Sequence, residues 1–234
     1  MSIPENIADL QSRIRQAAQR AGRSPSDISL MAVTKTHPPD RIREAYESGL
    51  RLFGENRVQE FSTKAGSLAD LVNADWHMIG HLQTNKAAKA AELFSAIDSV
   101  DSVKLAEKLD ATASALNKQL QVLIEVNVGG EAAKTGVAPD SPDLEDLLQA
   151  APRLEALNFR GLMTVPPFTE DPEGARPYFR RLRTLRDQIA ARNLPAITME
   201  ILSMGMSHDF AVAIEEGSTC IRIGTAIFGT REKP

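Results

Sequence analysis

Hydrophobic and polar residues follow two different periods along the chain. From residue 4 to residue 20, Ile7, Leu10, Ile14 and Ala17 recur at spacings of three and four. This spacing predicts a helix with one buried face. The next apolar run, ISLMAVT at residues 28–34, is nearly continuous. Such runs are typical of strands in a parallel sheet, where both faces are buried.

The unit of one apolar run and one amphipathic stretch then repeats. The helical stretches carry start and stop signals. Ser141 precedes Pro142, and Ser207 is expected to open a late helix that ends at Gly217. Eight alternating units predict an α/β fold over residues 1–234, a single (β/α)₈ TIM-type barrel with an extra N-terminal helix. The predicted strands are 28–34, 51–54, 76–79, 94–99, 121–127, 159–164, 198–202 and 220–223.

An open doubly wound sheet is the alternative fold. It predicts a glycine-rich phosphate loop after the first strand. The chain has VTKTHPP there, and neither GxGxxG nor GxxxxGK[ST] occurs in the sequence. The barrel is therefore the favoured architecture.

Composition narrows the function classes. The 234 residues suffice for one large α/β domain, and 42% hydrophobic with 25% charged residues is ordinary for a globular protein. A net charge of −4 gives no basic excess for nucleic acid or membrane binding. The single cysteine, Cys220, excludes an intrachain disulfide. No signal-peptide pattern and no apolar run of roughly 20 residues is found, so a cytoplasmic location is expected.

Candidate chemistry is sought where the apolar runs end, because barrel sites form at the carboxyl ends of the strands. Lys35 ends the first run. A lysine there is most often a solvated end charge. In a desolvated barrel mouth its pKa falls, and the neutral amine attacks an aldehyde. Asn56, in GEN after the second run, either caps the next helix or contacts a ligand.

Two histidines belong to the third run, WHMIGH. His77 is either a satisfied core histidine or a pocket residue, and His81 is a loop or cap residue. Their spacing of four suggests a metal site, but the segment is predicted as strand and turn. No acidic third ligand is evident nearby, which argues against zinc.

Small residues follow the seventh run in the stretch SMGMS. Ser203, Met204 and Ser207 lie where free N–H groups at a helix start would suit a phosphate. The simpler interpretation makes Ser207 a helix cap, with Asp209 favouring the helix dipole.

Arg222 lies inside the last apolar run, where a charge is costly unless it is paired. Glu125, similarly placed in LIEVNV, is a candidate partner. Gly224 and Thr225 follow at a position where barrels often bind phosphate. An amine, phosphate donors and an arginine together describe a site for a phosphate-bearing aldehyde cofactor.

Five motifs then identify a resemblance. VTKT, FGENRVQE, WHMIGHLQTNK, LSMGMSHDF and IRIGTAIFG occur in the order found in the pyridoxal 5′-phosphate (PLP) homeostasis protein family, the YggS/PROSC group. The chain resembles that family over residues 28–231. The resemblance implies a barrel like the N-terminal domain of alanine racemase. Relatives often carry tyrosine and phenylalanine where this chain has Arg57 and Met78, at the pocket margin.

The resemblance also implies roles for individual residues. Lys35 is expected to hold PLP as a Schiff base, and Arg222 to face the pyridine nitrogen. The remaining cofactor-binding residues implied by the resemblance are the phosphate-binding Ser207, Gly224 and Thr225, the nearby Ser203 and Met204, and the pocket residues Asn56 and His77.

A cofactor holder is favoured over an enzyme. A guanidinium offers only donors, so the pyridine nitrogen facing Arg222 stays unprotonated and the ring is a weak electron sink. An amino-acid racemase is the alternative, and it needs a second base. The two tyrosines, Tyr46 and Tyr178, are predicted on helices away from the mouth, and the chain ends at Lys233-Pro234 without a second domain.

Partners follow from the same resemblance. PLP-dependent apo-enzymes are the implied recipients, with no nucleic acid or membrane partner. A monomer is expected because no second domain offers an interface. Lys134, in GGEAAKTG, is a candidate second amine near the mouth, although a solvated loop lysine is the simpler interpretation. A metal-dependent barrel without PLP is a third hypothesis, against which the missing acidic ligand cluster argues.

Overall fold

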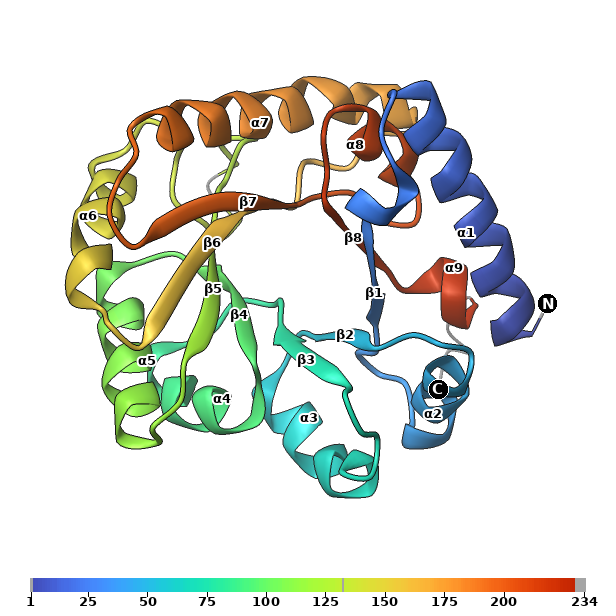
Figure 1. The fold of residues 1–234 in the computed structure, drawn as a ribbon, viewed down its shortest axis with the longest axis horizontal. Coiled ribbons are helices and arrows are strands. Elements are labelled where there is room, and N and C mark those ends of the chain that lie inside the picture. The colour runs from blue at the N-terminus through green and yellow to red at the C-terminus, as the bar shows by residue number, and fades with distance from the viewer. Residues whose placement is uncertain (1, 132, 230–234) are drawn as a thin grey trace.

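The fold is a closed barrel of eight parallel strands inside a ring of helices (Figure 1). The computed structural model describes residues 2–131 and 133–229. The chain end at Lys233 and Pro234 lies outside the described residues. The predicted (β/α)₈ barrel with an extra N-terminal helix is confirmed.

Each strand pairs with the next one along the chain, and β8 closes the ring on β1. Met31 of β1 lies opposite Arg222 of β8 in this closing pair. All eight predicted runs form strands, with ends shifted by at most a few residues. The strands are β1 (Ser29–Val33), β2 (Leu52–Glu55), β3 (Asp75–Met78), β4 (Ala96–Val100), β5 (Leu120–Glu125), β6 (Leu157–Met163), β7 (Ile197–Ser203) and β8 (Cys220–Ile223).

Helices connect the strands on the outside of the ring. The first helix begins with a capping box between Ser2 and Glu5 and packs against the last two helices. The helices are α1 (Ile3–Arg20), α2 (Pro39–Glu47), α3 (Val58–Lys64), α4 (Ala87–Leu93), α5 (Val103–Ala115), α6 (Pro142–Ala150), α7 (Arg176–Ala191), α8 (Phe210–Glu215) and α9 (Thr225–Phe228). Short 3₁₀ segments lie at Pro25–Asp27, Ala65–Leu68, Thr84–Lys86, Ala151–Arg153 and Pro172–Ala175.

The start of the late helix differs from the expectation. Helix α8 begins at Phe210, and its N-cap residue is Asp209, so Ser207 is not a helix cap. The Asp209 carboxylate accepts the N–H of Met206 at 2.6 Å, which holds the preceding residues in a turn. Ser207 Oγ instead accepts the N–H of Ala226 at 3.3 Å. The turn is thereby tied to the first turn of α9 (Thr225–Phe228).

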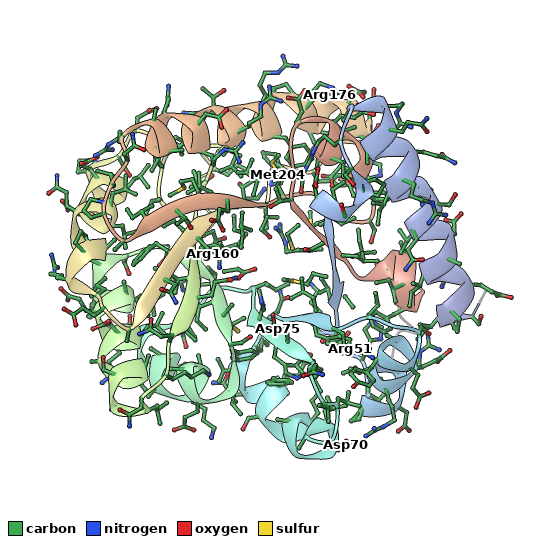
Figure 2. All side chains as sticks on the ribbon, in the orientation of Figure 1. Arg51, Asp70, Asp75, Arg160, Arg176 and Met204 are labelled. Carbon is green, nitrogen blue, oxygen red and sulfur yellow. The ribbon has the colours of Figure 1, made fainter. Side chains whose placement is uncertain are left out.

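Two layers of buried side chains hold the barrel together. An apolar layer fills the space between strands and helices, while polar and charged side chains, including His77, Asp98 and Arg222, are buried on the inward faces of the strands. Figure 2 shows side chains filling the ring, with Arg176 and Asp70 at its outer edge. Among the described residues, no helix is both long and apolar enough to cross a membrane.

Candidate functional site

A cavity of about 380 Å³ opens at the carboxyl ends of the strands. We call it the mouth cavity. Barrel enzymes carry their active sites at this end. Six of the residues predicted from the sequence are brought together here, from β1, β2, β7 and β8 and the loops that follow them. The lining residues are Val33, Lys35, Asn56, Ile79, Val165, Met206, Ser207, His208, Arg222, Gly224 and Thr225.

Lys35 stands on a tight turn after β1. The N–H of His37 donates to Thr34 O at 3.1 Å and closes the turn. Thr36 has a φ of 66°, in the left-handed region that β-branched residues rarely adopt. The N–H of Thr36 donates to Glu60 Oε1 at 2.5 Å, which holds this conformation. Strain of this kind, about 1–3 kcal/mol, concentrates at functional sites, and here it fixes the position of the lysine.

A buried ion pair supports this turn from below. Lys64 of α3 lies 2.8 Å from Glu55 Oε1 and donates to Thr34 O at 3.0 Å. Thr34 Oγ1 also donates to Glu55 Oε1, at 2.5 Å. Burial raises the pKa of Glu55, and the hydrogen bond from Lys64 opposes that rise. Sequence reasoning missed this pair, because no spacing rule relates residues on β2 and α3 that lie nine positions apart.

Asn56 presents an orphaned acceptor beside the mouth cavity. Its Oδ1 is buried and has no hydrogen-bond partner among the described residues. It does not cap α3, whose N-cap residue is Arg57. A Cβ on Gly80 would lie 2.4 Å from Asn56 O, so the glycine permits this close approach. A buried oxygen without a donor indicates a place for a ligand.

Arg222 is almost fully buried, with 3% of its surface exposed. Its guanidinium donates to Ser203 Oγ and to Thr164 O, both at 2.7 Å. Burial lowers the pKa of Arg222, but an arginine keeps its charge in proteins. Within residues 2–131 and 133–229 it forms no direct ion pair with Glu125, although Asp98, Glu125 and Asp209 favour its charge at longer range. Ser203 and Thr164 therefore orient the arginine at the mouth cavity.

The loops after β7 and β8 supply hydrogen-bond donors. In the part of the chain that the structure describes, the backbone N–H groups of Ser207 and Thr225 have no acceptor. Gly205 has a φ of 96°, and a Cβ there would lie 2.5 Å from Ala213 Cβ, so only glycine fits this turn. Free N–H groups in consecutive loops suit an anion such as phosphate.

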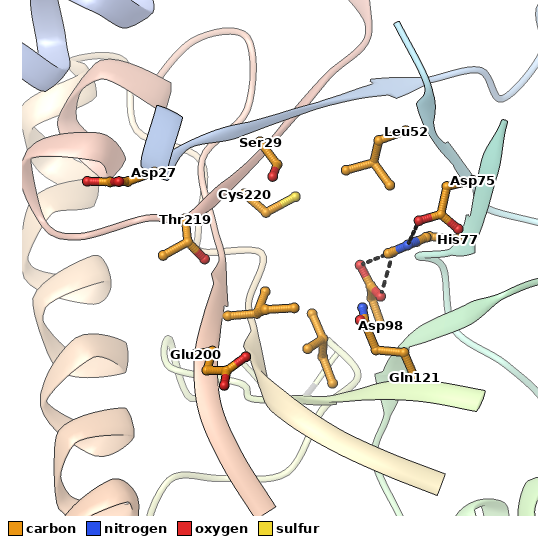
Figure 3. A pocket seen from close by; sticks show the side chains of 12 residues that line it. Asp27, Ser29, Leu52, Asp75, His77, Asp98, Gln121, Glu200, Thr219 and Cys220 are labelled. Carbon is orange, nitrogen blue, oxygen red and sulfur yellow. Dashed lines mark hydrogen bonds and ion pairs between the residues drawn. The ribbon is translucent and has the colours of Figure 1, made fainter. Parts of the chain in front are cut away.

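Met204 and His77 lie away from the mouth cavity, contrary to the expectation that they contact a cofactor there. Met204 follows the inward-facing Ser203 and is therefore turned outward, where it is fully buried in the apolar layer (Figure 2). His77 lies in the middle of β3, so its side chain is deeper in the barrel than the strand ends. It lines a cavity of about 330 Å³ at the opposite, amino-terminal end of the strands (Figure 3).

His77 is held between two carboxylates. Its Nδ1 lies 3.1 Å from Asp98 Oδ1, and its Nε2 lies 3.3 Å from Asp75 Oδ2. Burial would lower the pKa of His77, but Asp98 and Asp75 outweigh burial and raise the pKa to about 10. Sequence reasoning did not name these carboxylates, since Asp98 comes from the adjacent strand. No group of three metal-ligating side chains is found among the described residues.

Other candidate groups lie outside the mouth cavity. Lys134 forms an ion pair with Glu131 at 2.5 Å, on the loop after β5. Tyr46 of α2 donates its hydroxyl to Val72 O at 2.6 Å, in the segment before β3. Tyr178 lies on α7 and packs against the apolar layer outside the barrel. Neither tyrosine lines the mouth cavity.

Comparisons with known proteins agree with this geometry. The family model for the alanine racemase N-terminal domain matches residues 6–232. A protein of Aquifex aeolicus named pyridoxal phosphate homeostasis protein is 46% identical over 99% of this chain and 100% of its own length. Proteins with the same name from Pseudomonas aeruginosa and Escherichia coli are 46% and 39% identical, over 99% and 98% of this chain and 96% and 97% of their own lengths.

Solved structures of other proteins share the barrel fold of this chain. PipY of Synechococcus elongatus, crystallised with PLP bound, is 38% identical and superposes with a TM-score of 0.83 over 97% of this chain and 100% of its own. Alanine racemase of Clostridium difficile shares the fold, with a TM-score of 0.72 at 13% identity over 98% of this chain and 58% of that enzyme. This chain is therefore a member of the alanine racemase N-terminal domain family, within the branch formed by the pyridoxal phosphate homeostasis proteins.

Proposed function

We propose that this protein binds PLP in the mouth cavity, holds it as a Schiff base on Lys35, and serves PLP homeostasis and supply rather than catalysis. The observation that carries the proposal is one cavity that combines a lysine, a buried arginine and free backbone N–H groups. The orphaned Asn56 Oδ1 beside it also fits a ligand that carries a hydroxyl group. The names of the relatives and the PLP bound to PipY support the same cofactor.

Each residue then has a defined task. The Lys35 amine is the covalent anchor, and the N–H groups of Ser207 and Thr225 bind the phosphate. Arg222 would face the ring nitrogen and, being always charged and offering only donors, would keep that nitrogen unprotonated. PLP supplies an aldehyde and an electron-withdrawing ring, which withdraws less strongly when its nitrogen carries no proton. The site therefore suits reversible storage better than carbanion chemistry.

A racemase is the less favoured candidate. It requires a second proton donor on the face of the substrate opposite Lys35. The two tyrosines of the chain lie on outer helices, and Tyr46 is engaged with Val72 O. We further propose that the protein acts in the cytoplasm as a monomer and passes PLP to PLP-dependent apo-enzymes.

The test is spectroscopic. We would incubate the purified protein with PLP, record the visible absorption, reduce with borohydride and map the modified peptide by mass spectrometry. The expected result is a visible band and a phosphopyridoxyl group on Lys35. Lys35→Ala is expected to lose both, whereas Lys134→Ala is expected to keep both. A label spread over surface lysines, or no band with excess PLP, would contradict the proposal.

A further inference from the structure

The wall of the mouth opposite the phosphate loops carries two carboxylates, Asp101 and Glu125. We call its residues His81, Asp101, Glu125 and Thr135 the acidic rim. They come from the ends of β3, β4 and β5 and the loop after β5. His81 Nδ1 lies 3.5 Å from Asp101 Oδ2, and both side chains are accessible to solvent. Because β5 faces β1 across an eight-stranded barrel, the acidic rim lies across the mouth from Lys35.

Glu125 points into the barrel at the mouth end of β5. Side chains alternate along a strand, and both Gln121 and Leu123 line the cavity at the opposite end. Glu125, two positions further on, therefore faces inward nearer the mouth. It is 7% exposed. Its Oε1 accepts a hydrogen bond from Thr135 Oγ1 at 2.9 Å, while its Oε2 is buried and has no partner among the described residues.

Charged neighbours surround this carboxyl group. Burial raises the pKa of Glu125, and Asp101 raises it further, while Arg222 and His81 act in the opposite direction. A buried carboxylate oxygen without a donor is costly, and a cation that donates hydrogen bonds offsets the cost. A carboxyl group with a raised pKa is also a stronger base than an exposed one.

We propose that the acidic rim binds a primary ammonium group and that Glu125 accepts a proton from it. An ammonium group has three donors. The solvent-accessible Asp101 carboxylate receives it first, and a rotation of the Glu125 side chain then brings the buried, unpaired Oε2 to one of its donors. In the resting complex the proton stays on nitrogen. It passes to oxygen only as the amine reacts, when R–NH₃⁺ and the Glu125 carboxylate become R–NH₂ and the Glu125 carboxylic acid. Only the neutral amine has the lone pair that reacts with a carbonyl carbon. The inference rests on the proposed function, because it concerns the amine that would take the cofactor from Lys35.

Two sources offer a primary ammonium group, namely a lysine side chain of a recipient protein and a free amino acid. A free amino acid carries its own carboxylate close to the ammonium group, and that charge is repelled by Asp101. Nα-acetyl-L-lysine methylamide and L-alanine are therefore the two probes, with the first expected to bind more tightly. If L-alanine binds more tightly than the lysine derivative, the natural ligand of the acidic rim is a free amino acid, and the proposal that the rim binds an ammonium group still holds.

The decisive measurement uses the protein without PLP. Glutamate carboxyl carbons are labelled with ¹³C, and the Glu125 signal is assigned with the Glu125→Gln variant. Adding Nα-acetyl-L-lysine methylamide is expected to lower the apparent pKa of Glu125, since a cation favours the carboxylate. The matched probe with a hydroxyl in place of the ammonium group is expected to leave it unchanged. An equal response to both probes, or to neither, would overturn the proposal.

A second measurement follows transfer of PLP from the loaded protein to the same amine. The fraction loaded on Lys35 is scored first from the visible band, and the rates are normalised to it. Glu125→Gln is expected to slow transfer by about 100-fold, the lower end of the range for loss of a general base. Glu131→Gln, on the loop after β5 but paired with Lys134, is expected to match the wild type. If Glu125→Gln loads PLP normally and transfers it at the wild-type rate, the role of Glu125 is refuted but the proposed function is not. If the wild type fails to load PLP, the proposed function itself is refuted.

Discussion

At the scale of single residues, the imidazole of His77 links the stability of the barrel to pH. Its pKa is raised from 6.5 to about 10 by the carboxylates of Asp98 and Asp75. A group whose pKa is higher in the folded protein stabilises it fully below the unfolded pKa. That contribution disappears as the pH rises through the folded value. The pairing of His77 is therefore expected to stabilise the protein fully near pH 6 and to be lost near pH 10.

The measurement is urea unfolding at several pH values between 6 and 10 for the wild type and His77→Gln. The free energy of unfolding of the wild type is expected to exceed that of the variant most at pH 6. The gap is expected to narrow by a few kcal/mol toward pH 10, since each unit of pKa shift corresponds to about 1.4 kcal/mol. A gap that stays constant with pH would show that His77 contributes only by packing.

At the scale of secondary-structure elements, the buried pair of Glu55 and Lys64 joins β2 to α3 beneath the turn of Lys35. Removing one partner leaves the other charge buried, which costs about 3–5 kcal/mol. Lys64→Met is therefore expected to lower the free energy of unfolding by that amount in urea titrations. The double variant Lys64→Met with Glu55→Gln is expected to recover part of the loss.

The control for this prediction is an exposed pair. Lys89 and Glu92 lie 2.7 Å apart on α4, with both side chains about half exposed. Exposed pairs contribute about 0–1 kcal/mol, so Lys89→Met is expected to change stability little. Equal effects of Lys64→Met and Lys89→Met would contradict the supporting role of the buried pair.

A second prediction at this scale concerns Gly80, where the loop after β3 packs against the loop after β2. A Cβ there would press on the backbone of Asn56, 2.4 Å from its carbonyl oxygen. Gly80→Ala is expected to cost about 1–3 kcal/mol through overpacking. Because Asn56 lines the mouth cavity, the variant is also expected to bind PLP about tenfold more weakly, as measured by titration of the visible band. Gly66→Ala has open space around it and serves as the control, expected to bind PLP normally.

Strands and helices could be predicted from the sequence where the spacing of apolar residues is enough to distinguish them. Short, mainly apolar runs that alternate with amphipathic stretches marked all eight strands, since most strand positions of a closed parallel barrel are buried. The start of α8 was predicted wrongly, because Asp209 closes a turn on the N–H of Met206. A serine followed by an acid fits either a helix cap or such a turn, and only the three-dimensional contact distinguishes them.

At the scale of the whole molecule, the carboxyl ends of the strands converge, so residues that end apolar runs gather at one mouth. Lys35, Asn56 and Arg222 were therefore predictable as neighbours. The depth of a side chain inside the barrel could not be predicted, because it depends on strand register. For this reason His77 was expected at the mouth, whereas it lies at the amino-terminal end of the strands. The unpaired oxygen of Glu125 was equally unpredictable, because a missing hydrogen-bond partner can be recognised only in the folded protein.

The position of the tyrosines leads to the last prediction, which concerns turnover. Racemisation needs two proton-transfer groups on opposite faces of the substrate, and Lys35 can serve only one face. Glu125 lies across the mouth, but its carboxyl group is nearly buried and accepts a hydrogen bond from Thr135, so it is not positioned as a base for an α-carbon. The PLP-loaded protein is therefore expected to exchange the α-proton of L-alanine in D₂O no faster than free PLP at equal concentration, as followed by ¹H NMR. Formation of D-alanine that disappears in Lys35→Ala would instead establish a racemase, and Glu125→Gln would then show whether the acidic rim supplies the second base.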